Sequence, residues 1–233
     1  MEHRRTTAEQ LRWTLAADVC ALVRTHPGVT RAQVAKLLGI STGTATDLIT
    51  RMRQASLLTE GEPRSRGRGR PTAILTAHPD GPLILAVEIT ASDWRVAVAG
   101  IEGRPAVVAT ASHHSRSPDD VLVPIRRAVA AQVSRHASRV RAVSVAVAAT
   151  VRDGSIVQSS VLDWQRTSLT PLAVPGAKLF VTNDGTCEAL AESRRGAGRG
   201  ARSALHVTVL NGVGGGLVLN STPVLGATGL AWR

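Results

Sequence analysis

The sequence predicts two domains of different class, an α+β winged helix-turn-helix domain over residues 1–78 and an α/β domain over residues 83–233, joined by a hinge at 79–82. Three observations support this division. Apolar residues before His78 recur at helical spacing. The next residues, HPDGP, are rich in turn formers. After Gly81, short β-type apolar runs alternate with helix-like stretches, as in layered α/β folds.

The composition narrows the classes of function. The chain carries 28 Lys and Arg against 17 Asp and Glu, and its formal net charge of +11 favours association with a polyanion. Two cysteines, Cys20 and Cys187, are too few for a disulfide framework or a zinc site. No apolar run reaches the roughly 18 residues of a membrane helix, and the N-terminus lacks the apolar core of a signal peptide. We therefore expect a cytoplasmic protein with no membrane partner and no metal.

Three helices are expected in the first domain. The first covers residues 8–25 and ends at Pro27-Gly28. Its apolar stripe consists of Leu11, Leu15, Val19, Leu22 and Val23. Thr30 caps the second helix and Gly39 ends it, and Ser41 or Thr42 caps the third. The expected inward residues are Val34, Leu37 and Leu38 on the second helix and Ala45, Leu48, Ile49 and Met52 on the third.

The third helix predicts contact with double-stranded DNA because its outer face is small and polar. The major groove, about 12 Å wide, admits such a helix, and hydroxyl or guanidinium groups reach its phosphates and base edges. The outer face consists of Thr42, Gly43, Thr46, Asp47, Thr50 and Arg51. The predicted DNA contacts are Thr30, Ser41, Thr42, Thr46, Thr50 and Arg51. The alternative interpretation is an ordinary solvated helix face.

An arginine-rich segment follows the third helix. Leu57-Leu58 and residues 73–75 are expected to pair as strands, and between them arginines recur at alternate positions, partly separated by glycine. Glycine lets the backbone approach DNA closely, and arginine is attracted by a narrow minor groove. Arg66, Arg68 and Arg70 are therefore predicted DNA contacts in a wing. The alternative is a disordered basic linker.

The second domain predicts strands and crossover helices. The expected strands cover residues 83–89, 95–99, 107–109, 142–148, 179–181 and 204–210, and the expected helices cover 118–136 and 185–195. Pro118, followed by Asp119-Asp120, is typical of a helix start. Pro124 is expected to disturb this helix.

A series of motifs runs from Leu83 to Ala231. They are LILAVEITASDWRVAVAGIEGRP, VAVAATVRDGSIVQSSVLDWQ, VTNDGTCEALAE, VTVLNGVGGGLVLN and GATGLA. In this order they resemble the ROK family (repressors, open reading frames, kinases), and a wing ending in Gly-Arg-Pro is typical of its repressor branch. The resemblance implies an actin-like, ribonuclease-H-like fold of the sugar-kinase type that senses a sugar or sugar phosphate.

The resemblance also implies roles for individual residues. Asn183 and Asp184 match the family's sugar-binding pair, in which the aspartate of the kinases is the catalytic base. Three interpretations of this pair remain open: a helix cap, sugar contact without catalysis, and catalysis. Glu88–Ser92 lacks the family's phosphate-binding glycines, and Ala148-Ala149 replaces a Pro-Gly pair, so we expect no ATP and no other cofactor. Three glycines resemble a second phosphate loop but suit a tight hairpin equally well, namely Gly212, Gly214 and Gly215.

The end of the sequence departs from the family pattern. Trp232-Arg233 stands where relatives have Gly-Glu, and their Gly-His segment and cysteine-rich zinc site do not follow. We therefore expect an incomplete second lobe, with apolar surface exposed around Leu205–Leu210 and Leu217–Leu219. His113, His114 and His206 are expected at the surface or with partners rather than as metal ligands.

Together these features predict a DNA-binding transcriptional regulator of the ROK repressor type, with a degenerate, C-terminally truncated effector domain. It is expected to form a homodimer, to bind double-stranded DNA and a sugar, and not to be an enzyme. Three alternatives remain: a sugar kinase with Asp184 as base, a gene fragment that binds DNA without effector control, and an interaction module that binds no ligand.

Overall fold

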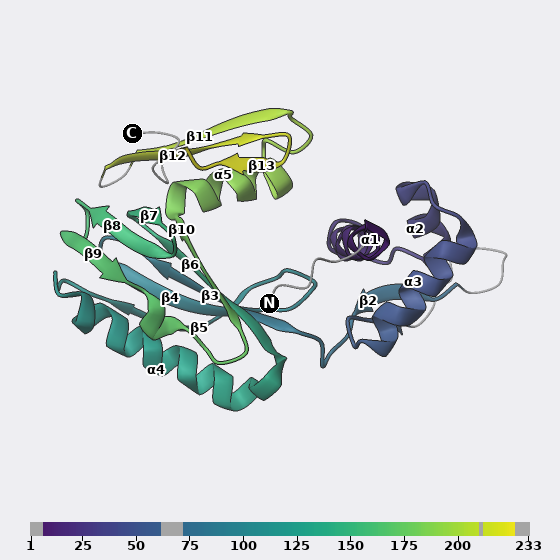
Figure 1. Ribbon diagram of the computed structural model, residues 1–233, viewed down its shortest axis with the longest axis horizontal. Helices are drawn as coiled ribbons and strands as arrows, with labels where there is room; N and C mark the ends of the chain where they lie inside the picture. The colour runs from purple at the N-terminus through teal and green to yellow at the C-terminus, as the bar shows by residue number, and fades with distance from the viewer. Residues whose placement is uncertain (1–6, 62–71, 210–211, 227–233) are drawn as a thin grey trace. The chain divides into compact units, whose positions relative to one another are not determined.

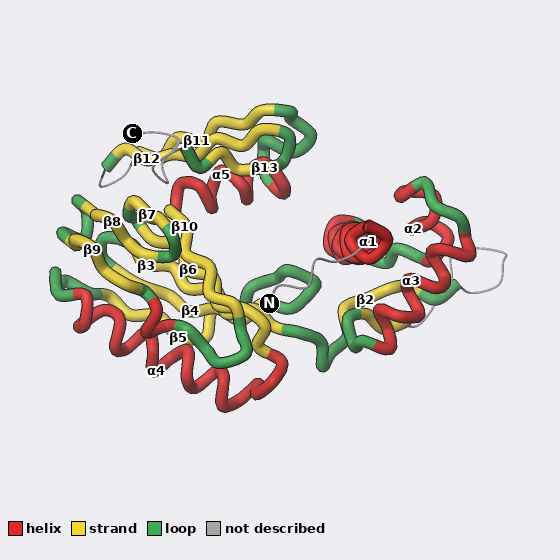
Figure 2. The backbone as a smooth tube through the Cα atoms, viewed as in Figure 1, coloured by secondary structure: helices red, strands yellow, loops and turns green. Residues whose placement is uncertain are grey.

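The computed structural model of the protein describes residues 7–61, 72–209 and 212–226 (Figure 1). The chain divides into two compact units, one comprising residues 1–83 and 99–104 and the other residues 84–98 and 105–233. The first unit is mainly helical, whereas the second combines helices with several sheets (Figure 2). None of the helices in the described part of the chain is long and apolar enough to cross a membrane.

Three helices and a hairpin form the first unit. The helices are α1 (Thr7–Thr25), α2 (Arg31–Leu38) and α3 (Thr42–Gln54), and the strands are β1 (Leu58–Gly61) and β2 (Ile74–Ala77). β1 and β2 pair antiparallel, from Leu58↔Ala77 to Gly61↔Ile74. Thr30 forms a capping box with Gln33 at the start of α2, and Gly39 ends that helix at φ 63°, a conformation that favours glycine. The three expected helices are thus confirmed.

The core of the first unit differs from the expected stripes at two leucines. Leu11 and Leu37, both expected to face inward, are 60% and 51% exposed. On α1 the expected Val19 and Val23 are buried, and Ala16, which was not expected, joins them at helical spacing. On α2, Val34 and Ala35 face the core, so the helix turns Leu37 toward solvent. The buried core consists of Ala16, Val19, Val23, Val29, Val34, Leu48, Ile49, Met52, Leu58 and Leu75.

A five-stranded mixed sheet is the centre of the second unit. Its order is β10-β6-β3-β4-β5, in which β6 and β10 pair parallel and β4 and β5 antiparallel. The strands are β3 (Leu83–Ile89), β4 (Asp93–Ala99), β5 (Ala106–Ser112), β6 (Val140–Val147) and β10 (Lys178–Asn183). All five were expected, although most are longer than the apolar runs that predicted them.

Helix α4 (Pro118–His136) lies along one face of this sheet (Figure 1). It buries Val121, Leu122, Ile125 and Val129 in the same core as the apolar side chains of β3 and β6. The disturbance expected at Pro124 is absent, because the helix continues through that residue. Burial of the apolar face on both sides of Pro124 offsets the backbone hydrogen bond that proline cannot donate. A short 3-10 helix, η1 (Ala137–Arg139), leads from α4 to β6.

A second, smaller sheet follows β6. It contains β7 (Thr150–Arg152), β8 (Ser155–Ser159) and β9 (Trp164–Ser168), and η2 (Thr170–Leu172) connects it to β10. These strands were not predicted, because they are short and mostly polar. The turn between β7 and β8 places Asp153 at φ 50° and Gly154 at φ 75°, the positive values that a two-residue hairpin turn requires. Trp164 is 1% exposed and anchors this sheet in the core.

Helix α5 (Asp184–Arg195) packs on a third sheet of β11 (Ser203–Val209), β12 (Val213–Leu219) and β13 (Thr222–Val224). The approach is close because the contact is made by glycine. A Cβ added at Gly216 would lie 2.5 Å from Gly185 O and 2.7 Å from Ala189 Cβ. Gly185 is equally confined, since its Cβ would lie 2.7 Å from Gly215 O. These glycines therefore allow a helix and a strand to meet at backbone distance.

The third sheet exposes apolar side chains where exposure was expected. Register places Leu205 opposite Leu217 and Val209 opposite Val213, so each pair shares one face of the sheet. Several of these side chains are at least 40% exposed: Leu205, Val207, Val209, Val213 and Leu219. Leu210, part of the same expectation, lies outside the described residues.

Candidate functional site

The Asn183–Asp184 pair lies where β10 ends and α5 begins. Asn183 is the N-cap of α5, with its Oδ1 accepting a hydrogen bond from Thr186 N at 3.1 Å. Its Nδ2 donates to Ala149 O and to Asp184 Oδ1, both at 3.0 Å. The expected helix cap is therefore Asn183, one residue earlier than Asp184, and both N–H groups of its amide donate within the protein.

Asp184 uses one oxygen for its hydrogen bonds to other described residues. Its Oδ1 accepts from Asn183 Nδ2 and from Gly185 N, the latter at 2.8 Å, whereas Oδ2 accepts none from another described residue. Burial raises the pKa of the Asp184 carboxyl, the hydrogen bond from Gly185 N–H opposes this, and the charge of Glu188 adds to the rise. A raised pKa and an oxygen that accepts from no other described residue suit a carboxylate that accepts a hydrogen bond from a ligand hydroxyl.

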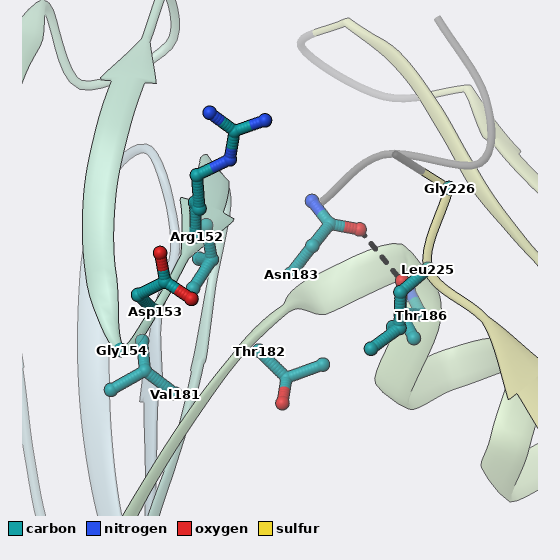
Figure 3. A pocket seen from close by; sticks show the side chains of 10 residues that line it. Arg152, Asp153, Gly154, Val181, Thr182, Asn183, Thr186, Leu225 and Gly226 are labelled. Atoms are coloured by element: carbon teal, nitrogen blue, oxygen red, sulfur yellow. Dashed lines mark hydrogen bonds between the residues drawn. The ribbon is translucent and has the colours of Figure 1, made fainter. Parts of the chain in front are cut away.

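A cavity of about 290 Å³ opens beside this pair (Figure 3). The β7–β8 turn and the end of β10 form two of its walls, and residues after β13 close another side. Figure 3 shows Arg152 and Asp153 across the cavity from Asn183. The lining residues are Val151, Arg152, Asp153, Gly154, Val181, Thr182, Asn183, Thr186, Leu225 and Gly226. Asn183 thus lines the cavity, whereas Asp184 lies next to it in sequence but is not among the lining residues.

The β3–β4 turn stands where the resemblance implies a phosphate loop. The Thr90 hydroxyl accepts from Asp93 N at 3.1 Å and from Ser92 N at 3.3 Å, and donates to Asp93 O at 3.1 Å. Glu88, on the preceding strand, forms an ion pair with Arg95 at 2.8 Å. A phosphate loop needs backbone N–H groups that point toward the ligand. In this turn the N–H groups of Ser92 and Asp93 already donate to the Thr90 hydroxyl.

Replacing Thr90 with valine, which has the same shape but no hydroxyl, should remove all three of these hydrogen bonds. We expect the free energy of unfolding to fall by about 1–2 kcal/mol. Urea denaturation measures this decrease. Thr110→Val is the matched control, since the Thr110 hydroxyl makes one hydrogen bond, to Trp94 O at 3.0 Å, and its removal should cost less. Equal decreases in the two variants would contradict the role assigned to Thr90.

The glycines that resemble a second phosphate loop lie largely in a strand. Gly214 and Gly215 lie within β12 and pair with Thr208 and Val207 of β11. Gly212 directly precedes β12, next to residues outside the described range. Gly214 and Gly215 thus lie in the β11–β12 hairpin, the alternative that the sequence left open, and a phosphate-binding role for them stays a prediction. Gly216, the next residue, is confined by α5, whereas a Cβ added at Gly214 would meet no atom within 4 Å.

One polar cluster near the site was not predicted. The Glu188 carboxylate accepts from Thr208 Oγ1 at 2.5 Å and lies 3.0 Å from His206 Nε2. His206 therefore has a partner, as expected. Burial, followed by nearby carboxylates, raises the pKa of the Cys187 thiol to about 11, so this cysteine is not a reactive thiolate. Within the described ranges, no group of His, Cys, Asp and Glu has the arrangement of a metal site.

A sequence profile of the ROK family matches residues 84–232. The chain belongs to the ROK family. The strand that carries Asn183 and the helix that begins at Asp184 both lie within the matched region. The sequence resemblance to this family is thereby confirmed.

Solved ROK structures share the fold. A ROK transcriptional regulator, described as a homologue of the E. coli MLC protein, superposes with a TM-score of 0.71 at 19% identity, over 96% of this chain and 58% of its own. A ROK glucokinase from Streptomyces griseus, in complex with glucose and AMPPNP, has a TM-score of 0.55 at 27% identity, over 64% of this chain and 48% of its own. A putative N-acetylmannosamine kinase from Listeria monocytogenes has a TM-score of 0.54 at 22% identity, over 64% and 51%. The chain thus spans about half the length of these ROK proteins, and its α/β unit has their actin-like, sugar-kinase-type fold.

In the N-terminal unit of this ROK protein, α3 presents the polar face expected from the sequence. Thr42, Thr46, Asp47 and Arg51 are exposed, and Thr50 is partly buried. Asp47 accepts from Arg51 Nε at 3.2 Å, which orients the guanidinium along the helix.

The two capping residues have structural partners. Ser41 caps α3 by accepting from Thr44 N at 3.0 Å. Thr30 accepts from Gln33 N at 3.3 Å. Their side chains therefore order the helix starts, where backbone N–H groups also suit a phosphate. Arg66, Arg68 and Arg70 lie outside the described residues.

Proposed function

We propose that the protein is a DNA-binding transcriptional regulator of the ROK repressor branch whose α/β unit senses a sugar. One observation carries the proposal. The superposition on a ROK transcriptional regulator extends over 96% of the chain, whereas those on the ROK kinases described above cover 64%. The likeness to the regulator therefore extends over a larger share of the chain than the likeness to these kinases.

The N-terminal unit acts in this proposal as a winged helix. Helix α3 enters the major groove with Thr42, Thr46 and Arg51 toward the DNA, while α2 crosses the backbone. The arginine-bearing segment between β1 and β2 forms the wing and contacts the minor groove. Two copies of the chain would bind two half-sites, and their spacing would mirror the symmetry of the dimer.

The first test is selection of bound duplexes from a random pool by the full chain. The proposal predicts enrichment of a defined sequence, with two related half-sites if a dimer binds. Arg51→Ala should reduce affinity for the enriched duplex by about tenfold, the scale of one side-chain contact to DNA. A chain that enriches no sequence over the starting pool is not a sequence-specific regulator.

The α/β unit acts as the sensor. The cavity between the β7–β8 turn and β10, which Asn183 lines and Asp184 follows in sequence, offers polar groups for a sugar. A ligand that prefers one arrangement of the two units shifts that equilibrium and so alters DNA affinity. Transfer of phosphate is not part of the proposal, because the β3–β4 turn uses its own N–H groups internally.

Asp184→Asn should weaken sugar binding by about tenfold or more, since it removes a charged hydrogen-bond acceptor. Calorimetry with a panel of monosaccharides measures the affinity. Asp119→Asn, the same change in the first turn of α4, is the control and should have no effect. Binding needs the carboxylate form, so affinity should be full at neutral pH and fall on acidification at a higher pH than for an ordinary aspartate, because the pKa of Asp184 is raised.

A sugar kinase with Asp184 as its base is the second candidate. The raised pKa of this carboxyl and the likeness to a glucokinase in complex with glucose and AMPPNP favour it. An ATP-dependent phosphorylation assay on the same sugar panel separates the two functions. Turnover that disappears in Asp184→Asn would replace the sensor proposal with the kinase, whereas binding without turnover supports the sensor.

A further inference from the structure

A carboxylate on the first strand of the hairpin joins both helices of the proposed DNA-binding pair. Glu60 Oε1 lies 2.6 Å from Arg31 Nε, in the first turn of α2. Glu60 Oε2 lies 3.1 Å from Arg53 Nη1, in the last turn of α3. Each oxygen of one side chain therefore holds a different arginine, and each arginine comes from a different helix.

The strand geometry explains why this glutamate reaches the helices. Side chains alternate across a strand, so Glu60 shares a face with Leu58, which is fully buried. Its cross-strand neighbour is Leu75, which is 1% exposed. The Glu60 side chain is accordingly only 23% exposed. A carboxylate in this position needs cationic partners to offset its desolvation, and Arg31 and Arg53 supply them.

The ion pairs of Glu60 are not the sole contacts between the described parts of the hairpin and the helical region. Leu75 N donates to Val29 O at 2.8 Å, which fixes β2 to the residues before α2. Glu60 adds ion pairs from β1 to both α2 and α3. Gly61, the next residue, is the last of β1, and the arginine-rich segment follows it in the sequence. Glu60 therefore adds contacts to both helices near the end of the strand that this segment follows in the sequence.

The ion pairs with Glu60 also limit the contacts that Arg31 and Arg53 can make with DNA. A guanidinium that is paired with a carboxylate is less available to a DNA phosphate, and phosphate contacts raise affinity for every sequence alike. Arg31 stands in the first turn of a helix, where phosphates commonly bind. Pairing with Glu60 therefore lowers sequence-independent affinity while it holds the hairpin in register with α3.

We propose that Glu60 is a specificity-determining residue, which holds the β1–β2 hairpin against α2 and α3 and withholds Arg31 and Arg53 from sequence-independent phosphate contact. This inference rests on the proposed DNA-binding function and adds to it the residue that separates specific from general binding. Its signature is a change in discrimination between sequences, which a purely structural role would not produce.

The test compares Glu60→Gln with wild type on the duplex enriched by selection and on a scrambled duplex of equal length. Glutamine keeps the size of the side chain and removes its charge. We expect the ratio of the two affinities to fall by about tenfold. The salt dependence on the scrambled duplex should steepen by up to about 0.9 in log–log slope for each arginine released.

Asp18→Asn is the matched control. It removes one negative charge from the exposed face of α1 in the same unit, and Asp18 forms no ion pair with the described residues. The control should leave the affinity ratio unchanged. Glu60→Asp keeps the charge on a shorter side chain and should give an intermediate ratio, so it decides the question if Glu60→Gln does not fold.

Three results would overturn the inference. The first is an unchanged affinity ratio in Glu60→Gln and Glu60→Asp. The second is an equal decrease of affinity for both duplexes together with a lower melting temperature, since this indicates a structural role only. The third is a wild-type chain that binds no duplex, which overturns the proposed function as well. Selective binding by wild type with an unchanged ratio in the variants overturns only the role of Glu60.

Discussion

Replacing Gly216 with alanine should lower the free energy of unfolding by about 2–3 kcal/mol. The added methyl group would lie 2.5 Å from Gly185 O, 2.7 Å from Ala189 Cβ and 2.8 Å from Thr186 Cα. All three belong to α5, and none is the far end of a flexible side chain. The helix must therefore move away from β12, which loosens the packing on both sides of the interface. Thermal and urea denaturation of the full chain measure the effect.

Gly214→Ala is the matched control for this substitution. Gly214 lies in the same strand, two residues earlier, and a Cβ added there meets no atom within 4 Å. We expect its unfolding free energy to stay within about 0.5 kcal/mol of wild type. Similar destabilisation of the two variants would mean that glycine serves strand flexibility throughout β12, rather than close packing against α5 at Gly216.

Replacing Arg68 and Arg70 together with alanine should weaken binding to every duplex. If each arginine binds one phosphate or the minor groove beside it, the magnitude of the log–log salt slope should fall by about 0.9 for each arginine replaced. Affinity at low salt should decrease by about tenfold or more, because two positive charges no longer bind the DNA backbone. Fluorescence anisotropy on labelled duplexes over a range of salt concentrations measures both quantities.

The control for the wing substitution removes the same charge elsewhere. Arg126 and Arg127 are adjacent residues of α4 in the α/β unit, and both are exposed to solvent. Their double replacement with alanine changes the net charge equally, so a comparable decrease in affinity would show that overall charge, not the wing, is responsible. Affinity and salt slope that stay at wild-type values in the Arg68 and Arg70 variant would contradict the assignment of this segment as a wing.

The local sequence pattern was sufficient to predict the bounds of elements whose apolar periodicity is clear. The strand over Leu83–Ile89 and the helix over Pro118–His136 have the predicted bounds, because apolar alternation and a proline start are local signals. The hairpin strands β7 to β9 were missed, since their residues are largely polar and tertiary packing stabilises them. Leu37 was placed inward because spacing predicts a stripe but not which edge of it faces the core.

The site was predictable in position but not in detail. A family motif located Asn183 and Asp184, yet only the structure shows that Asn183 is the cap and that Asp184 Oδ1 accepts from both Asn183 Nδ2 and Gly185 N. Gly214 and Gly215 were ambiguous, because loops and close packing both favour glycine. The pairing of Glu60 with Arg31 joins residues 29 positions apart, and no local pattern encodes such an interaction.

The engagement of Asn183 Nδ2 determines how a ligand can gain affinity at this site. Any ligand group that accepts a hydrogen bond from Asn183 Nδ2 must displace Ala149 O or Asp184 Oδ1, because both N–H groups already donate within the protein. Such an exchange leaves the number of hydrogen bonds unchanged. A hydrogen bond to Asp184 Oδ2 is an additional one instead. Ligands that differ only in the hydroxyl presented to Asp184 should therefore be discriminated, whereas those that differ only in a group that accepts from Asn183 Nδ2 should bind alike.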